Sequence, residues 1–276
     1  MVIKRLLKIT LICVALLALL LSGPLYIMLS GSHDTGSNWR TSSRDSAGLA
    51  PPAGENVDAV VQVYAARAFR WRGYFAVHTW ISVKEAGADH YTVYDVTGFR
   101  RASVNARRDV PDRAWYGSPP QLIADIRGDR AEQAIAGILE AVEHYPYAND
   151  YNAWPGPNSN TFVAWVIREV PELDVALPSH AVGKDYLGGK FISKAPSGTG
   201  YQANLGGFFG VMLGLREGLE FNVLGLSFGV SPLALGIKLP GIGDLSLRSV
   251  NPMHSEPEAQ RQLANSGSQE SMPASF

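Results

Sequence analysis

The chain has 276 residues, of which 46% are hydrophobic and 18% are charged, and its formal net charge is −1. This length is enough for one sizeable hydrophobic core, so we expect one principal domain. No run of Lys and Arg is longer than a pair, which excludes the concentrated basic face that nucleic-acid binding requires. The single cysteine, Cys13, lies in an apolar N-terminal stretch. The rest of the chain therefore has neither a disulfide framework nor a thiol nucleophile.

The N-terminal segment has the features of a membrane anchor. Three basic residues, Lys4, Arg5 and Lys8, stand at the start of an apolar stretch over residues 6–29, with Pro24 inside it. A helix of this length spans the roughly 30 Å of hydrocarbon in a bilayer, where a proline is tolerated as a kink. The basic flank predicts a cytoplasmic N-terminus.

We therefore expect residues 1–30 to be a single-pass anchor in the inner (cytoplasmic) membrane, with the C-terminal domain on the periplasmic, extracytoplasmic side. A cleaved signal peptide is the alternative. Residues 31–56 and 251–276 are polar and almost lack aliphatic side chains, which is typical of a flexible tether and of a disordered tail. The folded domain is predicted at residues 57–250.

The first part of this domain has the alternation of β-strands. Residues 57–69, 74–84 and 90–99 alternate apolar and polar side chains, and residues 85–89 have the composition of a hairpin turn. These features predict an antiparallel meander. A connection rich in Pro and Arg follows.

Two helices are predicted next. Residues 129–144 and 160–170 carry apolar residues at helical spacing, and Pro171 ends the second helix. We expect both helices to pack on one face of the sheet. The sequence therefore predicts an α+β fold, with an antiparallel sheet packed against helices.

Residues 206–247 are apolar and rich in glycine. Glycine costs about 0.8–1.0 kcal/mol relative to alanine inside a helix, so short strands joined by tight turns are the better interpretation. We expect a buried hairpin. The alternative is a segment that rests on the membrane surface or against a partner, because large exposed apolar patches mark such contacts.

The clearest candidate for chemistry lies in residues 157–163, PNSNTFV, where Ser159 begins a helix and Phe162 follows three positions later. This pattern resembles the nucleophile site of the NlpC/P60 and lecithin-retinol-acyltransferase-like papain superfamily, in which a cysteine opens the helix. The resemblance implies a papain-like fold with Ser159 in place of the cysteine. A helix N-terminus stabilises an oxyanion, but an alcohol, unlike a thiol, depends entirely on an aligned base.

In the circularly permuted members of that superfamily, the catalytic histidine lies on a strand upstream of the nucleophile helix. His78 stands in such a strand here. A hairpin turn centred between Gly87 and Ala88 places Asp95 diagonal to His78 on the same face, where it would orient the imidazole ring. A turn displaced by half a step favours Tyr94 instead.

The order of an N-terminal membrane helix and a GPNSNTF segment also resembles DUF3750, a bacterial family of unknown function. That resemblance implies no particular activity. Four residues are candidates for substrate binding: Asn158, Asn160, Trp80 and Trp154.

Each candidate also has a structural interpretation. Asn158 or Ser159 suits a helix N-cap, and His78 suits a core histidine whose ring bonds to a carbonyl. The histidines lack the close spacing of zinc ligands, and no glycine-rich loop is followed by the Lys and Ser/Thr of a phosphate site. We expect neither a metal nor another cofactor.

The sequence thus predicts a membrane-anchored envelope protein with a papain-like, permuted NlpC/P60 domain. The expected activity is hydrolysis or transfer at an amide or ester bond, with Ser159 as nucleophile, His78 as base and Asp95 orienting the base. Peptidoglycan peptides or lipid acyl groups are the substrates by analogy alone. The alternative is a non-catalytic envelope protein that binds a peptide, glycan or lipid in the same cleft. The oligomeric state is left open.

Overall fold

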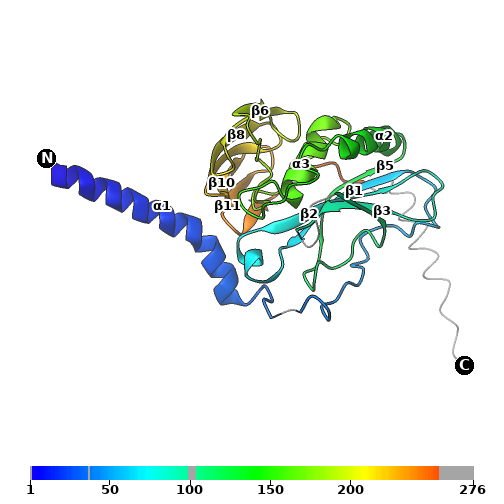
Figure 1. Ribbon diagram of the computed structural model, residues 1–276, viewed down its shortest axis with the longest axis horizontal. Helices are drawn as coiled ribbons and strands as arrows, with labels where there is room; N and C mark the ends of the chain where they lie inside the picture. The colour runs from blue at the N-terminus through cyan, green and yellow to red at the C-terminus, as the bar shows by residue number, and fades with distance from the viewer. Residues whose placement is uncertain (1, 37, 99–103, 255–276) are drawn as a thin grey trace, which may run out of the picture.

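The computed structural model describes residues 2–36, 38–98 and 104–254 and shows an α+β protein with a protruding N-terminal helix (Figure 1). This helix, α1 (Val2–Ser30), is long and apolar enough to cross a membrane, a test that a signal sequence also passes. The expected apolar helix is confirmed. Most of the predicted disordered tail, residues 255–276, lies outside the described residues.

The first sheet is antiparallel and five-stranded, in the order β4-β3-β2-β1-β5. Its strands are β1 (Val60–Arg67), β2 (Val77–Lys84), β3 (Thr92–Val96), β4 (Val104–Arg108) and β5 (Gln121–Arg127). A short 3-10 helix, η1 (Arg70–Tyr74), joins β1 to β2. The expected meander is confirmed. The connection rich in Pro and Arg contains two further strands, β4 and β5, which we did not expect.

The hairpin between β2 and β3 has the first of the two predicted registers. Ile81 lies opposite Tyr94 in the ladder, which corresponds to a turn centred between Gly87 and Ala88. The ladder pairs only residues 81–83 of β2 with β3. Among the described residues, the start of β2, including His78, therefore pairs with β1 on one side and with no strand on the other.

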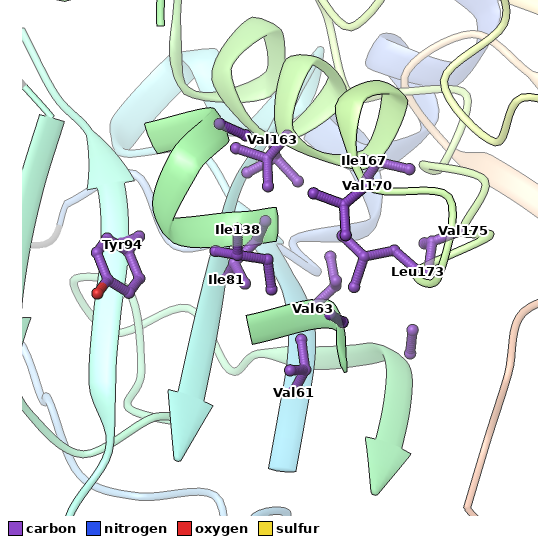
Figure 2. Close-up of a cluster of buried hydrophobic side chains, with 14 of the residues drawn as sticks. Val61, Val63, Ile81, Tyr94, Ile138, Val163, Ile167, Val170, Leu173 and Val175 are labelled. Atoms are coloured by element: carbon purple, nitrogen blue, oxygen red, sulfur yellow. The ribbon is translucent and has the colours of Figure 1, made fainter. Parts of the chain in front are cut away.

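Helices α2 (Asp129–Glu143) and α3 (Ser159–Glu169) cover one face of this sheet, as expected. Alternate residues of the strands point to the helices, and helix residues at spacings of three and four pack against them. Figure 2 shows this core, in which Val61, Val63, Ile81, Ile138 and Ile167 are all buried. The core fixes the N-terminus of α3 beside the start of β2.

The second sheet is antiparallel and seven-stranded, in the order β12-β11-β10-β9-β8-β7-β6. Its strands are β6 (Ile192–Lys194), β7 (Gly200–Leu205), β8 (Phe209–Gly214), β9 (Gly218–Val223), β10 (Leu226–Ser231), β11 (Gly236–Leu239) and β12 (Gly243–Ser246). Short strands with tight turns were expected for residues 206–247. The expectation of a buried hairpin is wrong, because one apolar face of this sheet is exposed.

Parts of both polar flanking segments contact the domain. In the predicted tether, Ser46 pairs with Arg113, and the N–H of Leu49 donates to a carboxylate oxygen of Asp112. After β12, the side chain of Asn251 exchanges hydrogen bonds with the backbone of Ala176. Ordered contacts therefore extend to both sides of the predicted domain at residues 57–250.

Candidate active site at the N-terminus of α3

The N-terminus of α3 is closed by a capping box. Asn158 is the N-cap, and its Oδ1 accepts hydrogen bonds from the N–H groups of Asn160 (2.9 Å) and Thr161 (3.2 Å). The hydroxyl of Thr161 accepts one from the N–H of Asn158 (3.1 Å). Because Asn158 supplies the cap, the hydroxyl of Ser159 is not needed for it. Ser159 is the first helical residue and is buried.

Asn160 fixes this helix end against β2. Its Nδ2 donates to the carbonyl oxygens of Val77 (2.9 Å) and Val182 (2.8 Å), and its Oδ1 accepts from the hydroxyl of Thr79 (2.9 Å). Val77 and Thr79 are the two neighbours of His78. Asn160 therefore sets the position of α3 relative to the strand that carries the histidine.

The amides of Asn158 and Asn160, which we named as candidate substrate ligands, bond to the protein itself. The Nδ2 of Asn158 donates to the carbonyl oxygens of Ala153 (3.2 Å) and Val182 (3.0 Å). In the structure, these two amides hold the end of the helix that carries Ser159. A substrate contact for either residue stays a prediction.

His78 lies on the opposite face of the first sheet from the helices, together with Trp80. Its side chain is 7% exposed and stacks on Trp115, with 3.6 Å between the ring centroids. Its Nε2 lies 3.5 Å from Oδ2 of Asp95, which is long for a good hydrogen bond. The structure thus brings together the histidine and the carboxylate that the register predicted.

Asp95 is held as a buried carboxylate by partners from β4. It is 1% exposed, and its Oδ1 accepts hydrogen bonds from Arg107 Nη1 (2.8 Å) and Asn105 Nδ2 (3.0 Å). Burial alone raises the pKa of Asp95, but His78 and Arg107 outweigh burial and bring that pKa down to about 2. Asp95 is therefore charged at neutral pH.

The imidazole of His78, in contrast to the carboxylate of Asp95, is held in its neutral form. Burial lowers the pKa of His78 from its ordinary value, although Asp95 acts in the other direction. The ring is therefore neutral at pH 7, as a general base must be. Since Nε2 faces the carboxylate, Nδ1 is the ring nitrogen available to a substrate or a nucleophile.

A cavity of about 750 Å³ joins these elements. It is lined by His78, Asn158, Ser159, Asn160 and Trp154 among the predicted site residues. Large apolar side chains make up much of its remaining wall: Phe69, Trp71, Phe75, Trp115, Tyr151 and Leu226. Such a cavity has the size and the character of a ligand site.

Two predicted site residues lie outside the lining of this cavity. Asp95 stands behind His78, as an orienting group would. Trp80 is buried on the same sheet face, where it stacks on Tyr64 and donates from Nε1 to the carbonyl oxygen of Pro111 (2.8 Å). Trp80 thus supports the ring of His78 from within the core.

Ser159 and His78 line the same cavity. Among the described residues, no hydrogen bond engages the Oγ of Ser159, so none joins it to His78. Ser159 lies at the start of α3, which packs on one face of β2, whereas His78 is on the other face of that strand. Contacts between catalytic groups are often long in a site without substrate, where they tighten only in the reacting complex.

The part of the chain that the structure describes has no group of three or more His, Cys, Asp or Glu residues placed to hold a metal ion. The groups that this site brings together are a hydroxyl, an imidazole, a carboxylate and the end of a helix.

Comparisons with known proteins concern the first sheet and its helices. No curated protein and no solved structure matches the chain. Residues 58–186 contain β1–β5, α2 and α3, and so include Ser159, His78 and Asp95. They match the sequence model of DUF3750, a family described as protein of unknown function.

Proposed function

We propose that this protein is a membrane-anchored acyl hydrolase or acyltransferase that acts on an ester or amide in the cell envelope. One observation carries the proposal: a single cavity holds Ser159 at the N-terminus of α3 and a neutral His78 backed by the buried carboxylate of Asp95. This is the order of groups that activates a nucleophile, in which a base is oriented by a third residue. The papain-like resemblance of the sequence points to the same three residues.

The proposed reaction begins with attack of Ser159 Oγ on the carbonyl carbon of the substrate, while the hydroxyl proton passes to Nδ1 of His78. The bond to the leaving alcohol or amine then breaks, and that group takes the proton from His78. Water, or the hydroxyl or amine of an acceptor, attacks the acyl-serine in the same way and restores the enzyme. Asp95 stabilises the imidazolium that forms in each step.

The end of α3 offers one backbone group for the developing oxyanion. The N–H groups of Asn160 and Thr161 already bond to Asn158. Among the described residues, the N–H of Ser159 has no hydrogen-bond partner. We propose this N–H as an oxyanion donor, aided by the partial positive charge of the helix end.

The walls of the cavity favour an apolar acyl group as the part of the substrate that binds there. Aromatic and aliphatic side chains dominate the lining, including Phe69, Phe75 and Leu226. Such walls gain more from a lipid chain than from a peptide or glycan, whose polar groups would lose water without compensation. We therefore propose a lipid acyl ester or amide as the substrate class.

The test uses the full chain in nanodiscs with medium-chain aryl esters, acylated lipids and muropeptides. We expect turnover by the native protein, loss of it in Ser159→Ala and His78→Gln, and unchanged turnover in Ser249→Ala, which alters an exposed serine. A fluorophosphonate probe should label the native protein and not Ser159→Ala. Equal turnover in the native protein and Ser159→Ala, with the fold intact, would refute the proposed nucleophile.

A second variant distinguishes a serine that reacts weakly in an activating site from a position that is not activated at all. Ser159→Cys, made with Cys13→Ala so that one thiol remains, should react with a thiol-directed reagent faster than a free thiol does. The expected cause is the imidazole of His78 and the helix end, which lower the pKa of a thiol placed there. Reaction at the rate of an exposed cysteine would show that position 159 is not activated.

The second candidate function is binding of the same acyl ligand without cleavage. The observation that favours it is the missing hydrogen bond between Ser159 and His78. A non-catalytic protein would bind a fluorescent fatty acyl probe in the cavity, with no product from any substrate. Trp154→Ala, which removes a half-exposed wall of the cavity, would then weaken binding, while Ser159→Ala would leave it unchanged.

A further inference from the structure

One face of the seven-stranded sheet is a continuous apolar surface. The register aligns Tyr201, Leu213, Leu219, Val230, Ile237 and Leu245 in one row across six neighbouring strands. Two further rows lie on the same face. We call the following large side chains, between 40% and 67% exposed, the outer face: Ile192, Tyr201, Leu205, Phe209, Val211, Leu213, Phe221, Val230, Ile237 and Leu245.

Charge is almost absent from this side of the sheet. By the alternation of the strands, Lys194 at the end of β6, opposite Tyr201, is the one charged strand residue that points the same way. The turns at the rim of the sheet add exposed leucines, among them Leu215 and Leu235. An apolar surface that continues over seven strands is far beyond the scattered apolar residues of an ordinary protein surface.

The other face of the same sheet is polar and buried. Glu220 accepts hydrogen bonds from Lys184 (2.6 Å) and Lys238 (2.7 Å). Asp185 accepts them from Asn204 (2.7 Å) and Asn222 (2.5 Å). These partners tie the polar face to the rest of the domain, so the sheet cannot turn its apolar face inward.

The transmembrane candidate α1 contacts η1 and also the turn between β11 and β12 of this sheet. Near its C-terminal end, Leu20, Gly23, Pro24 and Ile27 are buried. A Cβ on Gly23 would lie 1.8 Å from the carbonyl oxygen of Pro240, in the turn between β11 and β12. Figure 1 shows α1 leaving the domain on the side of β10 and β11.

The length of α1 sets the depth of this contact. The apolar stretch of α1 begins after Lys8, the last basic residue of the flank, and covers residues 9–29. At 1.5 Å per residue it is roughly 31 Å long, so all of it is needed to cross a hydrocarbon core of about 30 Å. The docked residues 20–27 then lie in the leaflet from which the helix emerges, and the turn at Pro240, which packs on Gly23, lies within that leaflet, roughly 9 Å along the helix from residue 29.

From this continuity we propose that the outer face rests on the lipid surface beside α1, so that the domain binds the bilayer by a sheet as well as by a helix. An apolar face that is almost free of charge and lies next to a membrane helix fits the acyl boundary of the lipids. Leu226, on the same side of β10 as Val230, also lines the cavity. The proposed contact therefore brings the cavity next to the lipids.

The test places one environment-sensitive fluorophore on the full chain in vesicles of phosphatidylethanolamine and phosphatidylglycerol. Single cysteines are introduced with Cys13→Ala: Leu213→Cys and Ile237→Cys on the outer face, and Glu140→Cys on the exposed side of α2 as the matched control. We expect a blue-shifted emission and several-fold stronger quenching by brominated lipid at positions 213 and 237 than at 140. Iodide in the water should show the reverse order.

Two outcomes would overturn the proposal. Equal quenching by iodide at all three positions would mean that the outer face is in water. Protection of positions 213 and 237 from both quenchers, with energy transfer between labelled copies, would mean that a second copy of the chain covers the face. Neither readout depends on catalysis, so the result is distinct from the fate of the proposed enzyme.

Discussion

The five-stranded sheet turns its apolar side chains inward against α2 and α3, where Ile81 and Ile138 are fully buried. The seven-stranded sheet turns its apolar side chains outward and buries Glu220 and Lys238. Both sheets alternate with a period of two, and both have a buried face. Alternation therefore identifies a strand, whereas the partners of a sheet decide which of its faces is the core.

The two buried faces also draw on different sources of stability. The first gains from the removal of apolar area from water, which needs no exact partner for each atom. The second depends on ion pairs and hydrogen bonds, in which each buried group requires its own partner. Substitutions in the two sheets separate these two sources of stability.

The largest effect is expected from Glu220→Gln. This change leaves the ammonium groups of Lys184 and Lys238 buried without their shared carboxylate. Breaking a buried pair in this way costs about 3–5 kcal/mol in the free energy of unfolding. Urea denaturation of the full chain in detergent, followed by tryptophan fluorescence, measures the loss, with the exposed Glu140→Gln as control.

A compensating variant sharpens this prediction. Replacing Glu220 by Leu and both lysines by Met removes the charges together, so most of the lost stability should return. A loss below about 1 kcal/mol in Glu220→Gln alone would show that the polar face is hydrated and that the contrast between the sheets is smaller than the structure suggests.

The next largest loss of stability is expected when an apolar side chain is truncated, and it should differ between the two sheets. Ile138→Ala, in the core of the first sheet, should cost about 2–5 kcal/mol because it leaves a cavity. Leu213→Ala, which is 64% exposed on the outer face, should change stability in detergent by less than about 0.5 kcal/mol. Similar losses in the two variants would mean that the outer face is covered by protein.

How much of this contrast was visible in the sequence differs between the two sheets. The strands of the first meander, the two helices and the glycine-rich strands follow from local periodicity and were predicted. That the polar face of the second sheet is the buried one was not predicted, because Lys184, Glu220 and Lys238 meet only in three dimensions. A period of two is the same whichever face is buried.

The candidate site shows the same division. The turn composition left two registers open, one that places Asp95 diagonal to His78 and one that favours Tyr94, and the structure has the first. Arg107, which holds that carboxylate, was missed because β4 lies in the segment that we interpreted as a connection rich in Pro and Arg. The alternation of Val104 and Ala106 with polar residues was the signal that would have revealed this strand.

The pH dependence of stability probes the junction of the two sheets. The carbonyl oxygen of His180 accepts from the N–H of Val77 in β2 (3.1 Å), and its ring faces Gly243 in β12. Burial, followed by the charges of Arg67 and Lys184, lowers the pKa of His180 from 6.5 to about 3. Between pH 6.5 and about pH 3, the imidazole of His180 is therefore protonated in the unfolded chain and neutral in the folded protein.

Stability is therefore complete above pH 6.5 and falls as the pH falls towards 3, by up to about 1.4 kcal/mol per pH unit from this group. His180→Gln should flatten the slope of unfolding free energy against pH between 6.5 and 4. An unchanged slope in His180→Gln would show that the junction admits the charged ring.

The smallest effect concerns the cap that holds Ser159 against the first sheet. Asn158→Ala removes the acceptor for the N–H groups of Asn160 and Thr161 and should cost about 1 kcal/mol. Asn158→Asp keeps that acceptor but loses the donor to the carbonyl of Val182. If the aspartate variant retains stability and probe reactivity while the alanine variant loses both, the cap is the element that places the hydroxyl. If both variants react with the probe as the native protein does, Asn160 alone holds α3 at β2.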